Sequence, residues 1–479
     1  MAFDLSTLSD LDLTDILSCI ERGEITSQEV YQYFQNRSQE LNTQLNAFVQ
    51  IYDQPSNPET NGVLKWLPIG IKDVFNEQDR LTQAASKMLE GYKSPYTATV
   101  MKKLLDAGMN SLGTLNMDEF AMGGSGENSS FGPALNPHDT TRIPGGSSSG
   151  SAVAVAAGMA PAALGTDTGG SIRQPASMCG VVGFKPTYGR NSRYGVMAMA
   201  SSLDTPGTLT KSVRDAYLLY SLMAGHDPLD STSLTSHVPL DVSVLQNTSL
   251  AGKRVGVPAE YFVEGLDAGV RASIDKAIEH IRSLGGEIVP VSLPHTQYGV
   301  SVYYIIMAAE VSTNMARYDG IRFGHKEWAG NDVTLNRSTW FGPEVLRRIM
   351  LGSHVLSAGF YDAYYHKASE VRELIRQDFE KAFEQCDVIV APVSPSVAWK
   401  IGEKTSDPLK MYLSDIYTIP ASLAGLPGMS LPIDPALPED GGDKPLPVGL
   451  QILAKTENEL EIFSFASALE RAYRNWETN

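Results

Sequence analysis

The stretch that decides the fold reads PGGSSSGSAVAVAAGMAPAALGTDTGGSIRQPA and runs from Pro144 to Ala176. It contains two glycine- and serine-rich loops, which are separated by a small-residue helical segment and a short apolar strand at 162–164. Glycine-dense loops expose backbone N–H groups and allow a ligand to approach the main chain. The stretch therefore predicts a binding or catalytic site within an α/β unit.

Strand-like and helical segments alternate around this stretch, between about Lys65 and Val213. The strand-like pieces are WLPIGI (66–71), NSLGTL (110–115), PAALGT (161–166) and GVVGFK (180–185), and the helical ones are TATVMKKLLDAG (97–108) and GSAVAVAAG (150–158). This alternation predicts an α/β layered domain.

A second alternating block lies further along the chain. It begins with a strand at Arg254, a helix that ends near Leu284 and a strand at 285–290, and it resumes with strands at Asp387 and Val448. A short Pro/Gly/Asp-rich loop is expected from 435 to 447. We expect a single domain over 1–479, with an N-terminal helical segment at 1–64, a core at 65–230 and a mostly helical, aromatic-rich insert at 296–385.

A helix start is visible near the N-terminus. Thr26-Ser-Gln-Glu29 has the capping-box pattern, in which the two end side chains each bind the other residue's backbone N–H. It predicts a helix that buries Val30, Tyr31 and Phe34, after a shorter helix that ends at Gly23. We expect this segment to serve packing and partner binding.

The charge balance of the chain is acidic. It carries 38 Lys and Arg against 55 Asp and Glu, a formal net charge of −17. Such a surface repels phosphate backbones, so the chain is a poor candidate for binding nucleic acid unaided. Cys19, Cys179 and Cys386 lack the paired spacing of a zinc site or a disulfide framework, which favours a reducing compartment.

No targeting or membrane segment is visible in the sequence. The start, MAFDLSTLSDLDLTD, is acidic and lacks the basic stretch and apolar run of a signal or transit peptide. No apolar run reaches the length that spans a bilayer. We therefore expect a cytoplasmic protein, or one of an organellar matrix after loss of a transit peptide, with no membrane partner.

Two familiar glycine-rich motifs fit the decisive stretch poorly. A phosphate-binding loop requires Lys and then Ser or Thr after its last glycine, whereas Gly170 is followed by Ser-Ile. Gly146-Ser-Ser148-Ser-Gly150 formally matches the G-x-S-x-G of a nucleophile elbow. That motif needs a buried strand before it, for which Arg142 and Pro144 are unsuitable, and a histidine later in the chain.

A third interpretation uses two serines and a lysine to cleave an amide. That reaction requires an activated nucleophile, a base to take its proton, and donors aimed at the developing oxyanion. Ser171 follows a predicted strand and a tight turn, so consecutive N–H groups could point at one oxygen. They would form an oxyanion hole from Thr168, Gly169, Gly170 and Ser171.

A purely structural interpretation of the same residues stays open. The glycines would then only form turns, and Ser148 or Ser149 would only cap the helix that ends at Gly158. The residues by themselves do not decide between the two.

Two runs in the stretch resemble the amidase signature family, whose members hydrolyse amides with a Ser-cisSer-Lys triad. They are Gly145-Gly-Ser-Ser-Ser-Gly150 and Asp167-Thr-Gly-Gly-Ser-Ile-Arg-Gln-Pro175, and Leu67-Pro-Ile-Gly-Ile-Lys72-Asp73 resembles the lysine motif of that family. The resemblance implies an α/β fold with a mixed central sheet covered by helices on both faces. It also implies that Lys72 is the base, Ser147 the bridging serine and Ser171 the acyl-forming nucleophile.

The chemistry of a lysine base supports this assignment independently. A lysine acts as a base only when burial destabilises its ammonium form and lowers its pKa by up to several units. Lys72 follows the apolar run 66–71, as a buried lysine should, although a solvated lysine paired with Asp73 is the competing interpretation. His138 lies nearby in sequence, and we assign it to its loop because a Ser-Lys system needs no histidine.

Nearly the whole chain resembles one group of that family, the A subunits of the glutamyl-tRNA(Gln) amidotransferases. The stretches that carry this resemblance are 116–123, 183–190, 200–204, 348–352, 361–365 and 412–415. It implies that glutamine is hydrolysed and that its ammonia converts misacylated Glu-tRNA(Gln) to Gln-tRNA(Gln). It also implies subunits B and C as partners, tRNA bound mainly through a partner, and ATP and Mg in a partner subunit, with no metal or cofactor in this chain.

Glutamine presents an α-carboxylate and an α-ammonium beside its amide, so its site needs one cation and one anion. Arginine suits a carboxylate because its fork binds two oxygens at once. By resemblance, Arg348 would hold the carboxylate, Asp415 the ammonium, and Tyr303 or Tyr304 would line the site. From the residues alone, Arg348 beside Arg347 could equally be a helix-surface cation, and Asp415 a local cap.

Three positions depart from the pattern of that group. Ser149 stands where glycine is usual, Ser422 where asparagine is usual, and Thr205-Pro-Gly-Thr208 replaces Gln-Ile-Gly-Pro. These departures put the local loop geometry in question. Two other functions stay open, a stand-alone amidase that acts on another small amide and a non-catalytic scaffold subunit.

Overall fold

Eleven strands of the described chain form one continuous sheet in the order β1-β3-β2-β4-β6-β5-β10-β11-β9-β7-β8. The computed structural model describes residues 3–56, 62–246, 248–262, 265–323 and 332–477, so short parts of the predicted N-terminal segment and insert lie outside the described residues. The strands are β1 (Phe48–Ile51), β2 (Pro68–Lys72), β3 (Asn110–Leu115), β4 (Ala162–Asp167), β5 (Val182–Lys185), β6 (Thr205–Thr210), β7 (Arg254–Pro258), β8 (Glu287–Val291), β9 (Val388–Pro392), β10 (Gly428–Ala436) and β11 (Leu446–Leu453).

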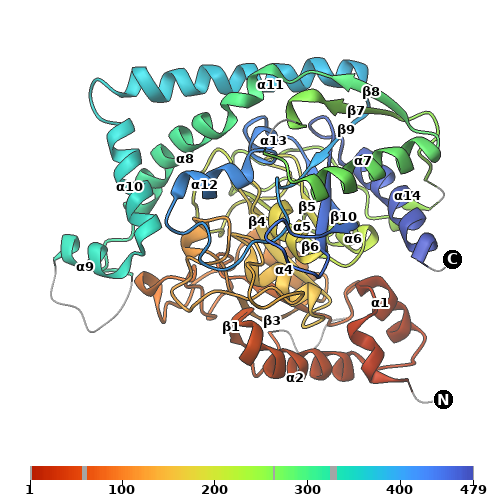
Figure 1. Ribbon diagram of the computed structural model, residues 1–479. Coiled ribbons are helices and arrows are strands. Elements are labelled where there is room, and N and C mark those ends of the chain that lie inside the picture. Colours follow the sequence, from red (N-terminus) through yellow and green to blue (C-terminus); the bar gives the residue numbers. More distant parts are fainter. Residues whose placement is uncertain (1–2, 57–61, 247, 263–264, 324–331, 478–479) are drawn as a thin grey trace.

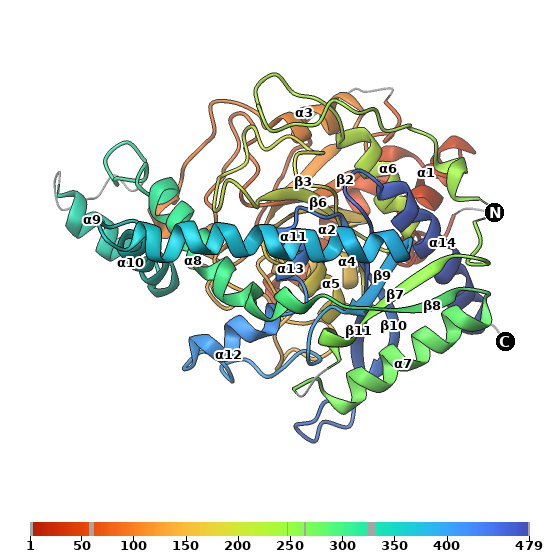
Figure 2. The ribbon, with the colours of Figure 1, turned by 90° about the horizontal axis from the view of Figure 1, so that it is seen from above.

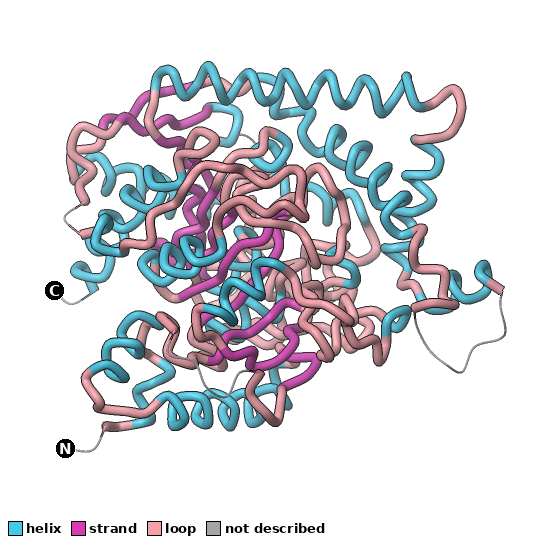
Figure 3. Tube along the Cα trace, turned by 180° about the vertical axis from the view of Figure 1, so that it is seen from behind, coloured by secondary structure: helices cyan, strands magenta, loops and turns pink. Residues whose placement is uncertain are grey.

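The sheet is mixed. β2 runs parallel to β3 and β4, and β7 runs parallel to β8 and β9. The pairs β1–β3, β4–β6, β5–β6, β5–β10, β10–β11 and β9–β11 are antiparallel. Figure 3 shows the strands running through the middle of the molecule between helices.

Helices surround this sheet. They are α1 (Leu13–Glu21), α2 (Ser27–Leu45), α3 (Thr99–Asp106), α4 (Ser149–Ala156), α5 (Arg173–Cys179), α6 (Val213–Met223), α7 (Ala268–Ser283), α8 (Gly299–Met315), α9 (Val333–Trp340), α10 (Pro343–Val355), α11 (Lys367–Gln385), α12 (Pro408–Tyr412), α13 (Ile419–Leu423) and α14 (Glu459–Glu477). In Figure 1, α1 and α2 lie below the sheet and α11 lies above it. Seen from above, α11 runs across the molecule over the strands (Figure 2).

Both faces of the sheet are covered by packed side chains, as the burial of alternate residues of β9 shows. Successive side chains of a strand point to opposite faces. Val388 and Val390 belong to an apolar cluster with residues of α6, α7 and α14, whereas Ile389 and Ala391 belong to the main core on the other side. A strand buried on both faces reads as a continuous apolar run, as Val-Ile-Val-Ala does. The predicted α/β fold with helices on both faces is confirmed.

The N-terminal helices begin as predicted. The side chain of Thr26 accepts from the Glu29 N–H, and the capping box that opens α2 is complete. Val30, Tyr31 and Phe34 are buried. α1, in contrast, receives no cap from its own N-cap side chain. Its cap comes from the first turn of α6.

Asp215 of α6 provides that cap. Its carboxylate accepts from the Leu13 and Thr14 N–H groups and from Thr14 Oγ1, each at 2.9 Å. These are backbone groups that the start of a helix leaves without an intrahelical partner. Asp215 is completely buried, so this contact fastens the N-terminal segment to the sheet layer.

The predicted strands correspond to β2–β5, β7–β9 and β11, but three strands were missed. β6 reads TPGTLT and is buried throughout, because it lies between β4 and β5. Pro, Gly and Thr in this run hide the usual apolar pattern. The departure at Thr205–Thr208 therefore lies in a central strand and not in a loop. β1 is short and only partly buried.

The predicted loop from 435 to 447 is wrong at both ends. β10 extends to Ala436 although it contains two prolines, and β11 already begins at Leu446. The insert at 296–385 is helical in its described part, where it contains α8, α9, α10 and α11. Among the described helices, none is long and apolar enough to cross a membrane.

The capping contact of α1 yields a stability prediction. We expect Asp215→Ala to lower the free energy of unfolding by about 2 kcal/mol or more, because three buried donors lose their acceptor. Urea unfolding followed by circular dichroism measures this. Asp241→Ala removes an exposed cap of a short helix and should change little. Equal effects of the two variants would contradict the role of Asp215.

Candidate active site

Lys72 is the last residue of β2, and its side chain is completely buried. The strand lies between β3 and β4 inside the sheet, so all of its residues are buried. Nζ lies 2.8 Å from Ser147 Oγ, 2.9 Å from Ser148 Oγ, 2.8 Å from Thr166 Oγ1 and 3.4 Å from the Thr166 carbonyl oxygen. Asp73 is bonded elsewhere, to the Gln83 and Ala85 N–H groups. The solvated, Asp73-paired interpretation of Lys72 is therefore wrong.

Burial changes the acidity of Lys72. It lowers the pKa of the ammonium to about 7, although the carboxylates of Asp118, Asp167 and Asp204 act in the opposite direction. Desolvation wins because it disfavours the charged form of a group that has lost its water. A large share of Lys72 is therefore neutral at neutral pH and able to accept a proton.

Ser147 and Ser171 come from two loops that are bonded to each other. The Ser148 N–H donates to the Ser171 carbonyl oxygen at 3.1 Å, so the residue after Ser147 contacts Ser171 directly. The Gly146–Ser147 peptide bond is cis. Ser147 is completely buried, whereas Ser171 is 8% exposed. The structure thus gathers Lys72 and the two serine loops, with Ser171 nearest to solvent.

The turn after β4 carries the predicted oxyanion hole at Thr168–Ser171. Gly170 has a φ of +146°, a conformation that residues with a side chain rarely adopt. The N–H groups of Ile172 and Arg173 point at Asp167 Oδ2, at 3.3 and 3.4 Å. Within the described residues, the backbone N–H groups of Gly169, Gly170 and Ser171 have no hydrogen-bond acceptor. These groups are available to an oxyanion.

A buried ion pair holds the two ends of this turn. Arg173 Nε and Nη2 lie 3.0 and 2.9 Å from the two Asp167 oxygens, and both side chains are 0% exposed. Burial alone would raise the pKa of Asp167, but the Arg173 charge holds it below its ordinary value. The guanidinium also donates to Gln451 Oε1 on β11 at 2.7 Å and to Ser422 Oγ on α13 at 2.8 Å.

Arg173 has no role among the residues predicted from the sequence. The signal that could have found it is simple, because Asp167 and Arg173 are the only charged residues between Pro144 and Ala176. Buried charges are normally paired. Ser422, one of the three departures from the family pattern, accepts a hydrogen bond from the Arg173 guanidinium of this pair. Ser149 lies further away, with Oγ 3.4 Å from the Asn116 carbonyl oxygen.

Asp204 fixes the first residue of the turn. Thr168 Oγ1 donates to Asp204 Oδ1 at 2.7 Å. The Asp204 carboxylate also accepts from the Met199 and Ala200 N–H groups. Burial raises the pKa of Asp204 to about 6, and these hydrogen bonds oppose the rise. The Thr168 hydroxyl is therefore engaged, which leaves the backbone N–H groups of the turn for the predicted oxyanion hole.

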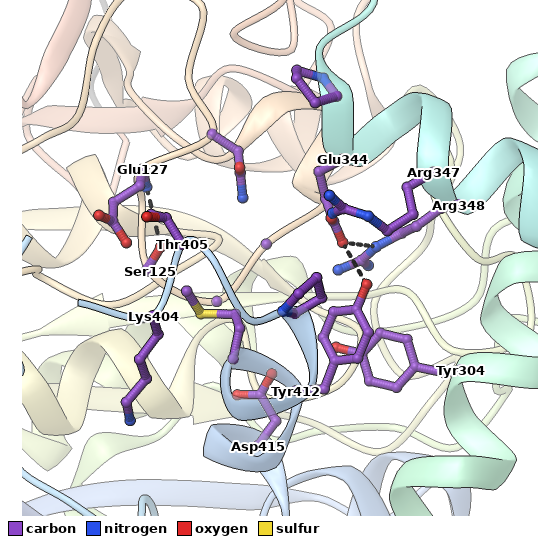
Figure 4. Close-up of a pocket in the computed structure, with 16 residues that line it drawn as sticks. Ser125, Glu127, Tyr304, Glu344, Arg347, Arg348, Lys404, Thr405, Tyr412 and Asp415 are labelled. Carbon is purple, nitrogen blue, oxygen red and sulfur yellow. Dashed lines mark hydrogen bonds and ion pairs between the residues drawn. The ribbon is translucent and has the colours of Figure 1, made fainter. Parts of the chain in front are cut away.

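Figure 4 shows a cavity of about 230 Å³ that is lined by other residues than Lys72, Ser147 and Ser171. Its walls are the loop 123–128, Tyr304 of α8, the first turns of α10, and the segment 404–415, which includes α12 and the 3-10 helix η8 (Leu413–Asp415). Arg348 and Asp415, the predicted ligands for the carboxylate and the ammonium, both line this cavity. The structure brings together two residues that the sequence places far apart.

Arg348 is buried in the cavity wall, 3% exposed, so the alternative of a helix-surface cation is wrong. Its Nε donates to Glu344 Oε1 at 2.8 Å. The Tyr304 and Tyr412 ring centres lie 5.4 and 5.9 Å from its Cζ.

Asp415 is a carboxylate of the cavity wall without an ion-pair partner among the described residues. No donor of the described residues contacts its carboxylate, and its oxygens face Gly124. Desolvation raises the pKa of Asp415 to about 8, against the opposing charge of Arg348. A ligand ammonium bound there would keep the carboxylate ionised.

Tyr303 and Tyr304 occupy different places. Tyr304 lines the cavity and stacks on Tyr412, with ring centres 3.8 Å apart. Tyr303 is buried under the oxyanion turn, where a Cβ added at Gly169 would lie 2.9 Å from its hydroxyl. Contact of Tyr303 with a substrate stays a prediction.

Two residues missed by sequence reasoning connect the cavity to the serine loops. Gln174 accepts from the Gly146 N–H at 2.9 Å and donates to the Gly124 carbonyl oxygen at 2.6 Å. Asp118 accepts from the Gly126 N–H at 3.0 Å, and its own N–H donates to the Ser147 carbonyl oxygen at 3.2 Å. The cavity wall and the Ser147 loop are therefore one bonded unit.

His138 is held within its loop, where Nε2 lies 2.9 Å from the Cys179 carbonyl oxygen. In the part of the chain that the structure describes, no group of three or more His, Cys, Asp or Glu side chains is arranged to hold a metal ion.

Comparison with known proteins identifies the family of the chain. The amidase family profile matches residues 29–463. The A subunit of the glutamyl-tRNA(Gln) amidotransferase of Caldanaerobacter subterraneus subsp. tengcongensis is 48% identical over 98% of this chain and 97% of its own length, and that of Geobacter metallireducens is 48% identical over 97% and 98%. The crystal structure of the corresponding protein of Thermotoga maritima, 39% identical, matches with a TM-score of 0.82 over 97% of this chain and 95% of its own. The chain belongs to the amidase family.

Proposed function

We propose that this chain is the amidase subunit of a glutamyl-tRNA(Gln) amidotransferase and that it hydrolyses glutamine to release ammonia. The observation that carries the proposal is the fully buried Lys72, 2.8 Å from Ser147 and beside the oxyanion turn of Ser171. The names of relatives 48% identical over nearly the whole chain support the choice of glutamine and of the tRNA-dependent reaction.

The hydrogen bonds of Lys72 support a proton relay. A neutral amine has two N–H donors and one lone pair. The Ser148 hydroxyl donates to the Thr166 carbonyl oxygen at 3.2 Å, so Ser148 Oγ accepts from the amine, and Thr166 Oγ1 is the second acceptor. The lone pair of Lys72 is then directed at the Ser147 hydroxyl. Ser147 Oγ makes no other hydrogen bond within the described residues, so it can accept a proton from Ser171 once the two hydroxyls come into contact.

The reaction follows from this relay. Ser171 Oγ attacks the side-chain carbonyl carbon of glutamine while its proton passes to Ser147, whose own proton passes to Lys72. The N–H groups of the turn stabilise the oxyanion. The C–N bond then breaks, and ammonia leaves with a proton returned through Ser147. Water cleaves the glutamyl ester by the same proton path and releases glutamate.

Substrate recognition uses the cavity. Arg348 binds the α-carboxylate and Asp415 binds the α-ammonium, which places the side-chain amide toward the serine loops. Gln174 and Asp118 connect the cavity wall to the Ser147 loop by hydrogen bonds, so the substrate-binding cavity and the catalytic loop are held in place together. Tyr303 supports the turn from below.

The ammonia is used elsewhere. In this proposal it passes to subunits B and C, where ATP and Mg activate the glutamyl group on tRNA, and tRNA is bound mainly through the partner. The net charge of −17 fits a chain that does not hold tRNA itself. The three cysteines are free and buried, which fits the cytoplasm or an organellar matrix.

The relay predicts which side chains glutaminase activity requires. We expect Ser171→Ala and Lys72→Ala to lower kcat by at least about 10³-fold, because each removes a group that acts in the transition state. Ammonia release from glutamine, with and without partner subunits, measures this. Ser149→Ala, whose hydroxyl makes only a 3.4 Å contact, is the control. Near wild-type rates in either triad variant would refute the mechanism.

Lys72 also predicts the pH dependence. The base is active only when neutral, and its pKa is about 7, so kcat should rise with pH and level off above that value. Below that pKa, kcat should fall about tenfold per pH unit. kcat/KM should rise as well but level off only above about 8, because Asp415, which binds the α-ammonium, ionises near that pH in the free site. A profile from pH 5.5 to 9 tests this. Constant kcat between pH 5.5 and 7 would contradict Lys72 as the base.

Dependence on partners separates this proposal from a stand-alone amidase. We expect the isolated chain to hydrolyse glutamine slowly and the assembled complex to do so faster, with a preference for glutamine over other small amides. Substrate profiling of both forms measures this. A fast isolated chain that prefers another amide would favour the stand-alone enzyme.

A further inference from the structure

Glu344 is a carboxylate in the wall of the cavity that none of the steps above uses. It is the second residue of α10, and it is 8% exposed. The N-terminal turn of a helix stabilises a negative charge, because its N–H groups lack intrahelical partners. Glu344 therefore lies where the start of the helix favours a negative charge.

Three donors hold this carboxylate (Figure 4). Arg348 Nε donates to Oε1 at 2.8 Å, and the Tyr412 hydroxyl donates to the same oxygen at 3.1 Å. Arg347 pairs with Oε2. Two of the donors lie on α10 and the third on α12, so the carboxylate is fixed from both sides of the cavity.

This arrangement determines which edge of Arg348 faces a ligand. A guanidinium offers five N–H donors in a planar fork. Arg348 Nε donates to Glu344, and Arg348 Nη1 makes only a weak contact with Met307 Sδ at 3.5 Å. No acceptor of the described residues binds Nη2. The two terminal nitrogens can thus bind both oxygens of a carboxylate.

The same carboxylate reaches the other half of the site through Tyr412. Tyr412 is the last residue of α12, and η8, which follows it directly, ends at Asp415. The Tyr412 ring stacks on Tyr304. Glu344 therefore connects the helix that carries Arg348 to the segment that carries Asp415.

We propose that Glu344 is a positioning residue that presets Arg348 and its separation from Asp415, and so makes the site selective for amides of α-amino acids. This inference rests on the proposed glutaminase function. Glu344 does not touch the reacting amide, so it acts on substrate binding and leaves the chemical step unchanged.

A competing role for Glu344 predicts the opposite change in glutamine binding. If Glu344 only competed with the substrate carboxylate for Arg348, its neutralisation would strengthen glutamine binding. Its three donors and its use of Nε argue against such a competitor. A positioning residue predicts weaker binding after neutralisation.

The test compares Glu344→Gln with the wild type in the full chain assembled with its partner subunits. We expect KM for glutamine to rise about tenfold or more, as for loss of a charge-assisted hydrogen bond, with kcat changed less than about threefold. Isothermal titration of L-glutamine into Ser171→Ala, with and without Glu344→Gln, should show the same tenfold weakening without turnover. Glu373→Gln, an exposed helix carboxylate paired with Arg376 three residues later, is the matched control.

The outcomes separate this inference from the proposed function. If the wild type does not hydrolyse glutamine and Ser171→Ala does not bind it, the function fails. If both behave as expected but Glu344→Gln leaves KM and binding unchanged, or strengthens them, only the positioning role is overturned. If Glu344→Gln does not fold, Tyr412→Phe decides, because removing one donor should raise KM about threefold, and an unchanged KM overturns the role.

Discussion

The buried ion pair between Asp167 and Arg173 is the constraint on which the site depends. Two completely buried charges are costly to remove from water, and removing one partner of such a pair costs about 3 to 5 kcal/mol. Here four of the five guanidinium N–H donors and both carboxylate oxygens are used, because Gln451, Ser422 and two backbone N–H groups complete the network. The pair joins the end of β4, the start of α5, α13 and β11. It thereby fixes the turn between them, whose remaining N–H groups stay free.

Lys72 is the contrasting case in the same core. Arginine side chains stay charged in proteins, and Arg173 has its counter-ion in direct contact. Lys72 is buried equally deeply, yet its neighbours are hydroxyl and carbonyl oxygens, and the nearest carboxylates act on it only from a distance. The first cation is permanent and structural, and the second can give up its proton near neutral pH. This difference supports the roles proposed for the two, Lys72 as the base and the turn fixed by Arg173 as the oxyanion site.

Much of the fold and site was predictable from the sequence, and the failures have physical reasons. Apolar runs such as 66–71 and 388–392 identified central strands, because residues buried on both faces are mostly apolar or small. β6 and β10 were missed because their prolines and glycines mask that signal. The motif residues Lys72, Ser147 and Ser171 were found from local sequence, whereas Glu344 and Gln174 act through contacts between distant segments. Tyr303 and Tyr304 are neighbours on α8. The orientation of that helix in the packed structure decides that Tyr303 contacts the turn at Gly169 and Tyr304 lines the cavity.

The central claim is that Ser171 carries the glutamyl group during turnover. The most direct measurement is mass spectrometry of the assembled protein after acid quench during reaction with glutamine, followed by peptide mapping. We predict a hydroxylamine-labile glutamyl ester on Ser171 in the wild type, and no adduct in Ser171→Ala. An adduct on another residue, such as Ser147 or Cys179, would contradict this assignment.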